Sequence, residues 1–391
     1  MKTKILIIAY RQSGLTQIFR QAAVVRLAQL AASLADEVWV FMTEEIYQGL
    51  KEKRAGLPVS VASRVISLEE MSCLPDEISF EPDEPVAILK GHSVWDRHLL
   101  DSWLTKTRQR GEADAVLDFG GVVSGQLCGA IIQVWSQEPQ EAPAVPSRSL
   151  PYLLNGGKES AATAEALLVA AQAKATRERD GVITRVVDRR LSRQVSPWLA
   201  RWGVRPNWIT FTGTLIGLIG AWLLAQGNYS SHLIGAALFL SAVVIDGVDG
   251  EVARLTLSET SFGHYLDVVT DNLVHAAVFI GMAVGLSRAT HDVRYLYVLM
   301  VMLGGVGLCG LSVYLVLQKT EALGPELQPQ ATRWLSWLAN RDFAYLVFLL
   351  ALVDRLAWFL WGAMIGSYLL FAFCLLILWR FSLKRQGSRS S

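Results

Sequence analysis

The chain has 391 residues, 52% of them hydrophobic, and a formal net charge of only +1. The length allows two domains, and the apolar content indicates that part of the chain lies in a membrane. The near-zero charge gives no reason to expect nucleic acid as a ligand. None of the four cysteines belongs to a C-x-x-C pair, which argues against a disulfide framework or a zinc site.

Residues 1–135 have the pattern of a cytoplasmic α/β domain. Apolar runs predict strands at 4–9, 38–42, 86–89 and 115–119, and helical periodicity predicts helices at 18–34 and 95–110. Strands that alternate with helices favour a parallel, doubly wound, Rossmann-like sheet. The first apolar run is too short for a signal peptide, so we expect this region to stay in the cytoplasm.

Residues 136–203 connect this domain to an apolar region. Residues 136–180 begin with a stretch rich in proline and serine, typical of a linker, and continue into an alanine-rich helix predicted over 159–179. Residues 181–203 mix arginines with apolar residues, which predicts a juxtamembrane amphipathic helix on an anionic membrane surface. A soluble linker helix is the alternative.

Residues 204–391 predict an all-α polytopic membrane domain of six transmembrane helices. The apolar segments are 207–226, 232–250, 262–286, 295–318, 342–355 and 357–380. The first four are long enough to span a bilayer. The fifth is short and ends at Asp354–Arg355, so the last two are expected to form a tight hairpin. Lysines and arginines gather before the first segment, between the fourth and fifth, and after the sixth, which places these regions in the cytoplasm beside the inner membrane.

Carboxylates interrupt the second and third apolar segments. The chain reads D-G-V-D-G-E-V-A-R from Asp246 to Arg254 and G-H-Y-L-D-V-V-T-D from Gly263 to Asp271. Each ionisable residue at membrane depth costs about 2.5–3.5 kcal/mol on insertion scales and marks a functional site. Carboxylates gathered there repel one another, and a divalent cation with a phosphate-bearing substrate would hold them together.

The spacing places these residues on one face of each of two helices. The first face carries Asp246, Asp249, Gly250, Ala253 and Arg254, and the second carries Gly263, Asp267 and Asp271. Two helices turned toward each other would bring the four carboxylates to one point. The small residues leave room for a large ligand, and Arg254 is a permanent cation suited to phosphate.

These eight residues form the signature D-x2-D-G-x2-A-R-x8-G-x3-D-x3-D, which resembles the CDP-alcohol phosphotransferase (CDP-alcohol phosphatidyltransferase) family. The resemblance implies transfer of a substituted phosphate group from a CDP-alcohol to an acceptor alcohol, with release of CMP, in phospholipid or inositol-phosphodiester synthesis. It implies Mg²⁺ or Mn²⁺ on Asp246, Asp249, Asp267 and Asp271, with Asp271 also as the catalytic base. It further implies an active site that faces the cytoplasm, a lipid environment and a homodimer.

The resemblance also assigns the substrate contacts. Gly250, Ala253, Arg254 and Gly263 are expected at the nucleotide, together with Asn207 and Thr210 in P-N-W-I-T. A helix N-cap is the alternative role for Asn207 and Thr210. Arg341 is a candidate for binding the phosphate of an acceptor such as a polyol phosphate, and a positive-inside anchor is its alternative role.

Residues 1–135 are weakly similar to nucleotidyltransferases, as in fusions of a cytidylyltransferase with a di-inositol-phosphate-phosphate synthase. The loop expected to be rich in glycine is A-Y-R-Q-S-G-L-T at 9–16, and His92 stands where a metal-binding aspartate is expected. We therefore predict a degenerate, inactive domain, in which His92 and Asp96 could be ordinary surface residues. Two alternatives stay open: a bifunctional enzyme that also makes its CDP-alcohol, and a non-catalytic transporter or binding protein.

Overall fold

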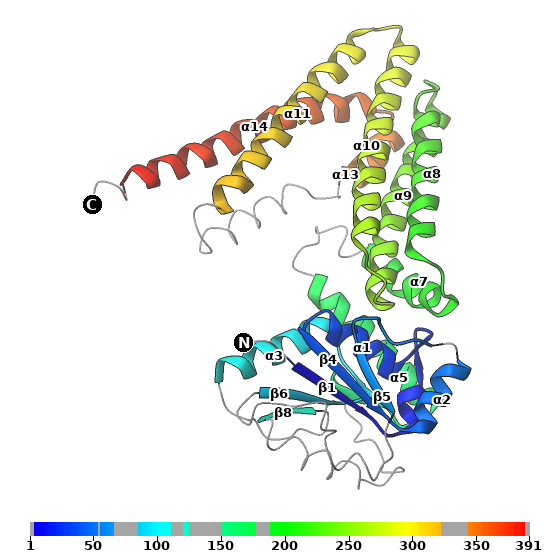
Figure 1. The fold of residues 1–391 in the computed structure, drawn as a ribbon. Helices are drawn as coiled ribbons and strands as arrows, with labels where there is room; N and C mark the ends of the chain where they lie inside the picture. Colours follow the sequence, from blue (N-terminus) through cyan, green and yellow to red (C-terminus); the bar gives the residue numbers. More distant parts are fainter. Residues whose placement is uncertain are drawn as a thin grey trace. The chain divides into compact units, whose positions relative to one another are not determined.

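The computed structural model describes residues 4–53, 55–65, 85–110, 120–124, 150–176, 188–321 and 343–387 (Figure 1). The chain divides into two compact units. The first comprises Met1–Thr176, Ser196–Val204 and Val252–Ser258. The second comprises Arg177–Val195, Arg205–Glu251 and Glu259–Ser391. The predicted domain boundary at residue 135 and the predicted strand at 115–119 lie outside the described residues.

The first unit is built on a five-stranded sheet of order β5-β4-β1-β6-β8. Its strands are β1 (Lys4–Ala9), β4 (Glu37–Met42), β5 (Ala62–Val65), β6 (Pro85–Lys90) and β8 (Gly120–Ser124). All neighbours are parallel except β6 and β8. Central β1 is an almost continuous apolar run, as expected of a strand covered on both faces. The predicted α/β region with a parallel sheet is confirmed for β5, β4, β1 and β6, whereas β8 pairs in the antiparallel direction.

Helices and short strand pairs complete the first unit. They are η1 (Gln12–Leu15), β2 (Gln17–Ile18), β3 (Gln21–Ala22), α1 (Ala23–Ala32), α2 (Glu44–Glu52), β7 (Ser93–Val94), α3 (Arg97–Arg110), β9 (Tyr152–Leu153) and α5 (Lys158–Thr176). The predicted helix over 18–34 is wrong at its start, because a hairpin of β2 and β3 precedes α1. Its turn residues Phe19 and Arg20 have φ angles of 47° and 67°.

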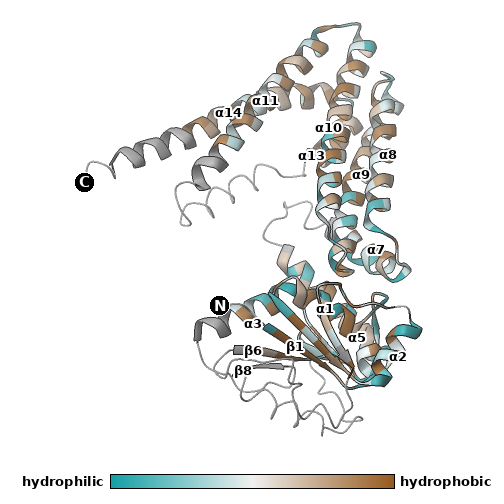
Figure 2. Ribbon diagram, viewed as in Figure 1, coloured by the Kyte–Doolittle hydropathy of each residue, from teal (hydrophilic) through white to brown (hydrophobic). Residues whose placement is uncertain are grey.

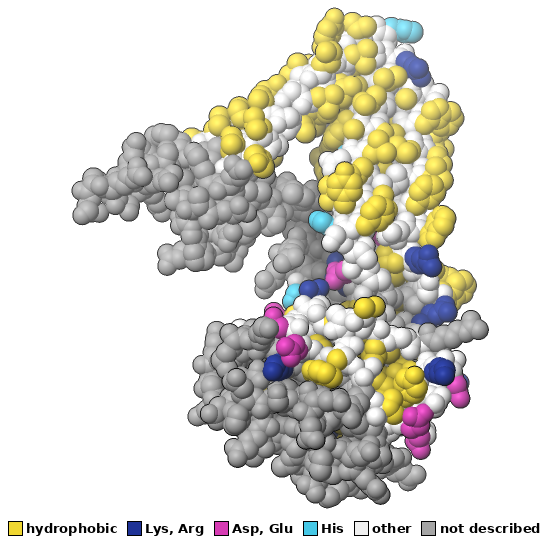
Figure 3. Space-filling model, in the orientation of Figure 1, with side chains coloured by type: hydrophobic (Ala, Val, Ile, Leu, Met, Phe, Trp, Pro, Cys, Tyr) yellow, Lys and Arg dark blue, Asp and Glu magenta, His cyan; other side chains and the backbone are white. Residues whose placement is uncertain are grey.

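The second unit is helical. The helices are α7 (Asp188–Trp202), α8 (Pro206–Leu224), α9 (Tyr229–Leu255), α10 (Ser261–Thr290), α11 (Arg294–Glu321), α13 (Phe343–Leu352) and α14 (Leu356–Gly387), with the ends of α7 and α9 assigned to the first unit. Figure 2 shows that hydrophobic residues predominate along these long helices, and Figure 3 shows many of their apolar side chains at the surface. Apolar side chains that face outward are typical of helices in lipid.

Five of the described helices are long and apolar enough to cross a membrane. They are α8, α9, α10, the Arg294–Ser312 part of α11 and the Leu356–Leu376 part of α14. The predicted fifth segment is α13, whose ten residues extend only about 15 Å at 1.5 Å per residue. The described residues thus give five candidate spans, and six crossings remain a prediction.

Helix α7 exposes an apolar face. Leu191, Val195, Trp198 and Trp202 follow one another at helical spacing and are all exposed. The Trp198 and Trp202 rings lie 4.0 Å apart between centroids. This face is the surface that the sequence assigns to a membrane.

Close packing joins α10 to α8. A Cβ on Gly281 would lie 2.3 Å from the Ala221 carbonyl oxygen. A Cβ on Gly285 would lie 1.9 Å from the Leu224 carbonyl oxygen. Only glycine permits backbones this close, as small residues do in membrane helix pairs. This contact fixes α10, which carries two of the candidate carboxylates, against α8 (Figure 1).

Candidate active site

Three carboxylates from two helices meet at one point. Oxygen atoms of Asp246 on α9 and of Asp267 and Asp271 on α10 all lie within 4.8 Å of one another. The first turn of α10 is fixed by Thr260, whose Oγ1 accepts a 2.9 Å hydrogen bond from the Gly263 N–H. The two helices therefore face each other as their spacing predicts, and three of the four signature aspartates come together.

The fourth aspartate, Asp249, has a different partner. Its carboxylate is buried, and its Oδ2 accepts a hydrogen bond from Thr210 Oγ1 on α8. The Pro206 carbonyl also lies 3.3 Å from this hydroxyl, but the hydroxyl has only one proton to donate. The structure thus places Thr210, predicted at the nucleotide, as a hydrogen-bond donor to Asp249.

The carboxylate cluster has the donor chemistry of a divalent-cation site. Asp267 Oδ1 is buried, and no hydrogen-bond donor among the described residues reaches it. A buried anionic oxygen without a partner is costly, and three carboxylates at this separation repel one another. Hard cations such as Mg²⁺ and Mn²⁺ take carboxylate oxygens as ligands. The residues present therefore fit such a cation.

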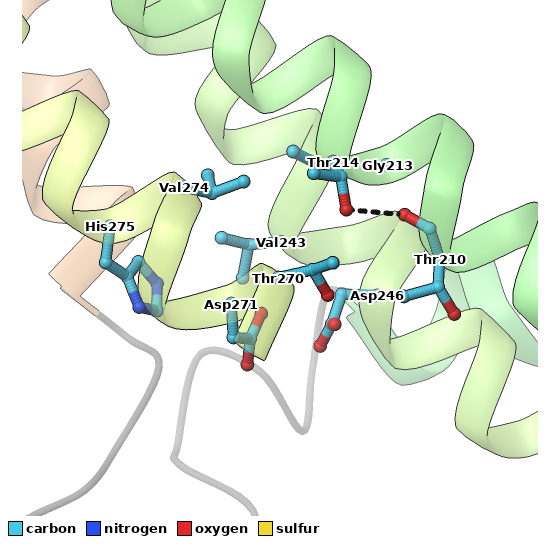
Figure 4. Close-up of a pocket in the computed structure, with 10 residues that line it drawn as sticks. Thr210, Gly213, Thr214, Val243, Asp246, Thr270, Asp271, Val274 and His275 are labelled. Atoms are coloured by element: carbon cyan, nitrogen blue, oxygen red, sulfur yellow. Dashed lines mark hydrogen bonds between the residues drawn. The ribbon is translucent and has the colours of Figure 1, made fainter. Parts of the chain in front are cut away.

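A small pocket of about 20 Å³ adjoins the carboxylates (Figure 4). Its lining comes from three helices: Thr210, Gly213 and Thr214 of α8; Ala242, Val243 and Asp246 of α9; Thr270, Asp271, Val274 and His275 of α10. In Figure 4 the Asp246 and Asp271 carboxylates point the same way, away from Val243 and Val274. Polar and apolar walls thus meet beside the candidate catalytic oxygen.

His275 is a pocket residue that the sequence pattern did not predict. It lies four residues after Asp271, on the same face of α10. Its ring packs against Phe239 and Phe343, with centroid distances of 5.8 and 5.2 Å. The i, i+4 spacing from the last signature aspartate is the signal that could have identified it.

The remaining predicted contacts lie in several places. Asn207 is exposed at the start of α8, and its Oδ1 would lie 3.4 Å from a Cβ placed on Gly263. Gly250 follows Asp249 directly on α9, and Ala253 and Arg254 occupy the last turn of that helix. Arg341, predicted to bind the acceptor, lies outside the described residues. A Cβ at position 263 would press on Thr260 Oγ1, at 3.0 Å, and would only touch Asn207.

His92 in the first unit is buried, which makes its interpretation as a surface residue wrong. It is 1% exposed, and no hydrogen-bond partner among the described residues reaches either ring nitrogen. Burial, with the nearby cations Arg11 and Lys90, lowers the pKa of His92 to about 3. A neutral imidazole among cations is a poor substitute for a metal-binding carboxylate.

Residues 203–378 match the family model described as CDP-alcohol phosphatidyltransferase. A bifunctional IPC transferase and DIPP synthase of Aquifex aeolicus is 37% identical over 107 residues, 27% of this chain and 24% of that protein. An archaetidylinositol phosphate synthase of Pyrococcus horikoshii is 32% identical over 92 residues, 24% of this chain and 47% of that protein. A phosphatidylinositol phosphate synthase of Mycolicibacterium smegmatis is 35% identical over 101 residues, 26% of this chain and 45% of that protein.

These alignments span 24–47% of the relatives' lengths. The matched residues 203–378 contain all eight positions of the aspartate signature and the helices that bring its carboxylates together. Residues 203–378 therefore form a region that matches the CDP-alcohol phosphatidyltransferase family.

Proposed function

We propose that this protein transfers a substituted phosphate group from a CDP-alcohol to an acceptor alcohol and releases CMP. The observation that carries the proposal is the meeting of Asp246, Asp267 and Asp271 between α9 and α10. Two of the relatives are inositol phosphate lipid synthases by name. This favours a lipid donor and a polyol-phosphate acceptor, although a CDP-inositol donor is a second candidate.

The site residues divide the work of the reaction. Asp246, Asp267 and Asp271, with Asp249 beside them, would hold Mg²⁺ or Mn²⁺. When bound, the cation neutralises the pyrophosphate and stabilises departing CMP. Asp271 accepts the proton of the acceptor hydroxyl as that oxygen bonds to the phosphorus. The bond from phosphorus to the CMP oxygen breaks, and CMP leaves with its electron pair.

Binding residues complete this mechanism. Arg254 pairs with a donor phosphate, and Gly250, Ala253 and Gly263 leave space for the nucleotide. The side-chain amide of Asn207, at the start of α8, hydrogen-bonds the nucleotide. Arg341 binds the acceptor phosphate. Thr210 keeps Asp249 oriented through its hydrogen bond.

We also assign the protein to the inner membrane as a multi-pass homodimer. Counting α13 as a crossing gives six spans, with the N-terminal domain and the active site facing the cytoplasm. Gly305 of α11 packs against Ser367 of α14, whereas Gly304, Gly307 and Gly310 are exposed and available for a partner helix.

The first unit is proposed to be a degenerate nucleotidyltransferase-like, Rossmann-like domain without catalysis of its own. The buried, neutral His92 supports this role. The Aquifex relative is named as a bifunctional enzyme, which supports the alternative that the first unit also makes the CDP-alcohol. CTP turnover by the full chain with an alcohol phosphate would establish that alternative.

CMP release by detergent-purified protein tests the proposal. CDP-diacylglycerol, CDP-inositol, CDP-choline and CDP-glycerol are offered with polyols and polyol phosphates, with Mg²⁺ or Mn²⁺ present. We expect metal-dependent CMP release from one donor–acceptor pair, reduced at least about 100-fold by Asp271→Asn. Folded protein that releases no CMP with any pair, while it carries cations across vesicle membranes, would instead be a transporter.

A further inference from the structure

The segment that joins α9 to α10 contacts the α/β domain within the first unit. This connector (Val252–Ser258) includes the last turn of α9 and belongs to the same compact unit as the sheet. Arg26 of α1 donates from Nη1 to the Leu255 carbonyl, and Gln21 donates from Nε2 to the Thr256 carbonyl at 2.8 Å. Two side chains of the α/β domain thus bind backbone carbonyls that α9 leaves without helical partners.

Leu257 attaches the connector by packing. Its side chain lies against the apolar core of the first unit, and its φ angle is 51°. The Ser258 N–H donates to the Ala253 carbonyl at 2.9 Å, and the Leu257 N–H donates to the Arg254 carbonyl at 3.3 Å. This is a Schellman ending, in which glycine usually occupies the left-handed position. Because a leucine there is strained, its packing against the core must maintain this conformation.

Arg26 is suited to an anchoring role by its charge. It is 6% exposed, and burial lowers its pKa to about 10, partly offset by Asp96 and Glu165. Arg26 therefore stays charged at neutral pH. It meets the C-terminal end of α9, where the helix dipole favours a cation.

The hairpin before α1 is itself fixed in place. The Phe19 N–H donates to Glu165 Oε1 at 2.9 Å, and Arg201 Nε donates to Glu165 Oε2 at 2.7 Å. Glu165 lies on α5, so the hairpin that carries Gln21 is tied to a second helix of the same unit. The hairpin from which Gln21 contacts the connector is therefore held in place by α5.

We propose that the α/β domain positions the connector for catalysis, with Arg26 as the positioning residue. The connector carries Ala253 and Arg254 of the signature, and the chain on either side of it carries the four aspartates. Fixing it fixes Arg254 and limits how far the two carboxylate-bearing helices can shift. This gives a domain without catalysis a role in the reaction, and the kinetic part rests on the proposed function.

The test compares full-length variants in detergent by hydrogen exchange and by kinetics. Arg26→Met should speed amide exchange in Val252–Ser258 by about tenfold or more, because the anchoring cation is lost. It should also lower kcat for CMP release by about tenfold with little change in KM, because misplaced catalytic groups slow the chemical step. Arg26→Lys, which keeps the charge and can still donate to a carbonyl, should recover part of both.

Arg20→Met is the matched control. Arg20 lies on the β2–β3 hairpin and donates from Nη1 at 2.7 Å to the Trp202 carbonyl at the end of α7, not to a connector carbonyl. The Arg20→Met variant should show amide exchange in the connector and a kcat that are both close to wild type. If Arg26→Met fails to fold, Gln21→Ala replaces it under the same criteria.

Two results would overturn the proposal. Unchanged amide exchange in Val252–Ser258 of folded Arg26→Met would show that Arg26 does not hold the connector in place. Faster exchange with an unchanged kcat would leave a structural contact without a positioning role. If wild-type protein releases no CMP at all, the proposed function fails, and the exchange comparison still decides whether the anchor exists.

Discussion

Single residues set the charge balance of the carboxylate cluster. We expect Asp267→Asn to weaken Mn²⁺ binding by about tenfold or more, because the change removes a charge from a buried oxygen without a donor among the described residues. Calorimetric titration of detergent-purified protein with Mn²⁺ measures this loss. Asp292→Asn is the control, since Asp292 lies in the α10–α11 connection and pairs with Arg294 at 2.7 Å. Equal loss in both variants would argue against a cation at the cluster.

The buried His92 predicts how stability varies with pH. In the unfolded chain it takes up a proton near pH 6.5, whereas its folded pKa is about 3. The stability that comes from keeping it neutral is complete above pH 6.5. It falls by about 1.4 kcal/mol per pH unit as the pH drops from 6.5 toward 3.

Thermal unfolding of full-length protein at pH 8, 6.5 and 5 measures this effect. His92→Phe keeps a ring against Tyr10 and should lose less stability than wild type below pH 6.5. His98→Phe, at an exposed position of α3, should follow wild type. If stability falls equally with pH in wild type and His92→Phe, then His92 takes up its proton in the folded protein at the same pH as in the unfolded chain.

At the scale of elements, the contact between α10 and α8 holds the carboxylate-bearing helix in place. Gly281→Ala should lower stability by about 1–3 kcal/mol, because the new Cβ would lie 2.3 Å from a backbone oxygen of α8. Gly362→Ala makes the same change within α14, where nothing lies within 4 Å, and should be neutral or stabilising. Thermal unfolding in detergent distinguishes them. Equal melting temperatures for the two variants would mean that α8 and α10 can move apart without loss of stability.

Most elements that position the site were predictable from sequence. The apolar runs placed α8, α9 and α10 within a few residues, since long periodic segments carry a strong signal. The β2–β3 hairpin could not be found, because Phe19 and Arg20 occupy positive φ without the glycine or asparagine that usually marks such a turn. The Thr210–Asp249 bond was also missed, because residues 39 positions apart give no local signal.

At the scale of the whole molecule, the number of crossings decides where the two ends of the chain lie. With the proposed cytoplasmic N-terminal domain, six crossings put Gln48 of α2 and Gln386, near the end of α14, in the cytoplasm, and Val293 between α10 and α11 outside. In a background without native cysteines, Val293→Cys should react with an impermeant maleimide in intact cells. Gln48→Cys and Gln386→Cys should react only after permeabilisation. Labelling of Gln386→Cys from outside would mean that α13 does not cross.

The sequence predicted a division into an α/β part and a helical part, but not its discontinuity. The compact first unit includes Ser196–Val204 and Val252–Ser258, which lie far along the chain from the sheet. Composition separates apolar from polar stretches, whereas membership of a unit depends on contacts such as Leu257 against the core. Such contacts leave no periodic trace in the sequence.

The four signature aspartates all lie at one end of the α9–α10 pair, in the last turns of α9 and the first turns of α10. During membrane insertion, this helix pair can enter with its opposite end leading, where α10 carries Arg288 in its last turn but neither helix carries a carboxylate. The reverse orientation would draw every one of these charges through the hydrocarbon, at about 2.5–3.5 kcal/mol each. The residues proposed to bind the cation therefore also direct the newly made hairpin into the bilayer, before any cation or substrate arrives.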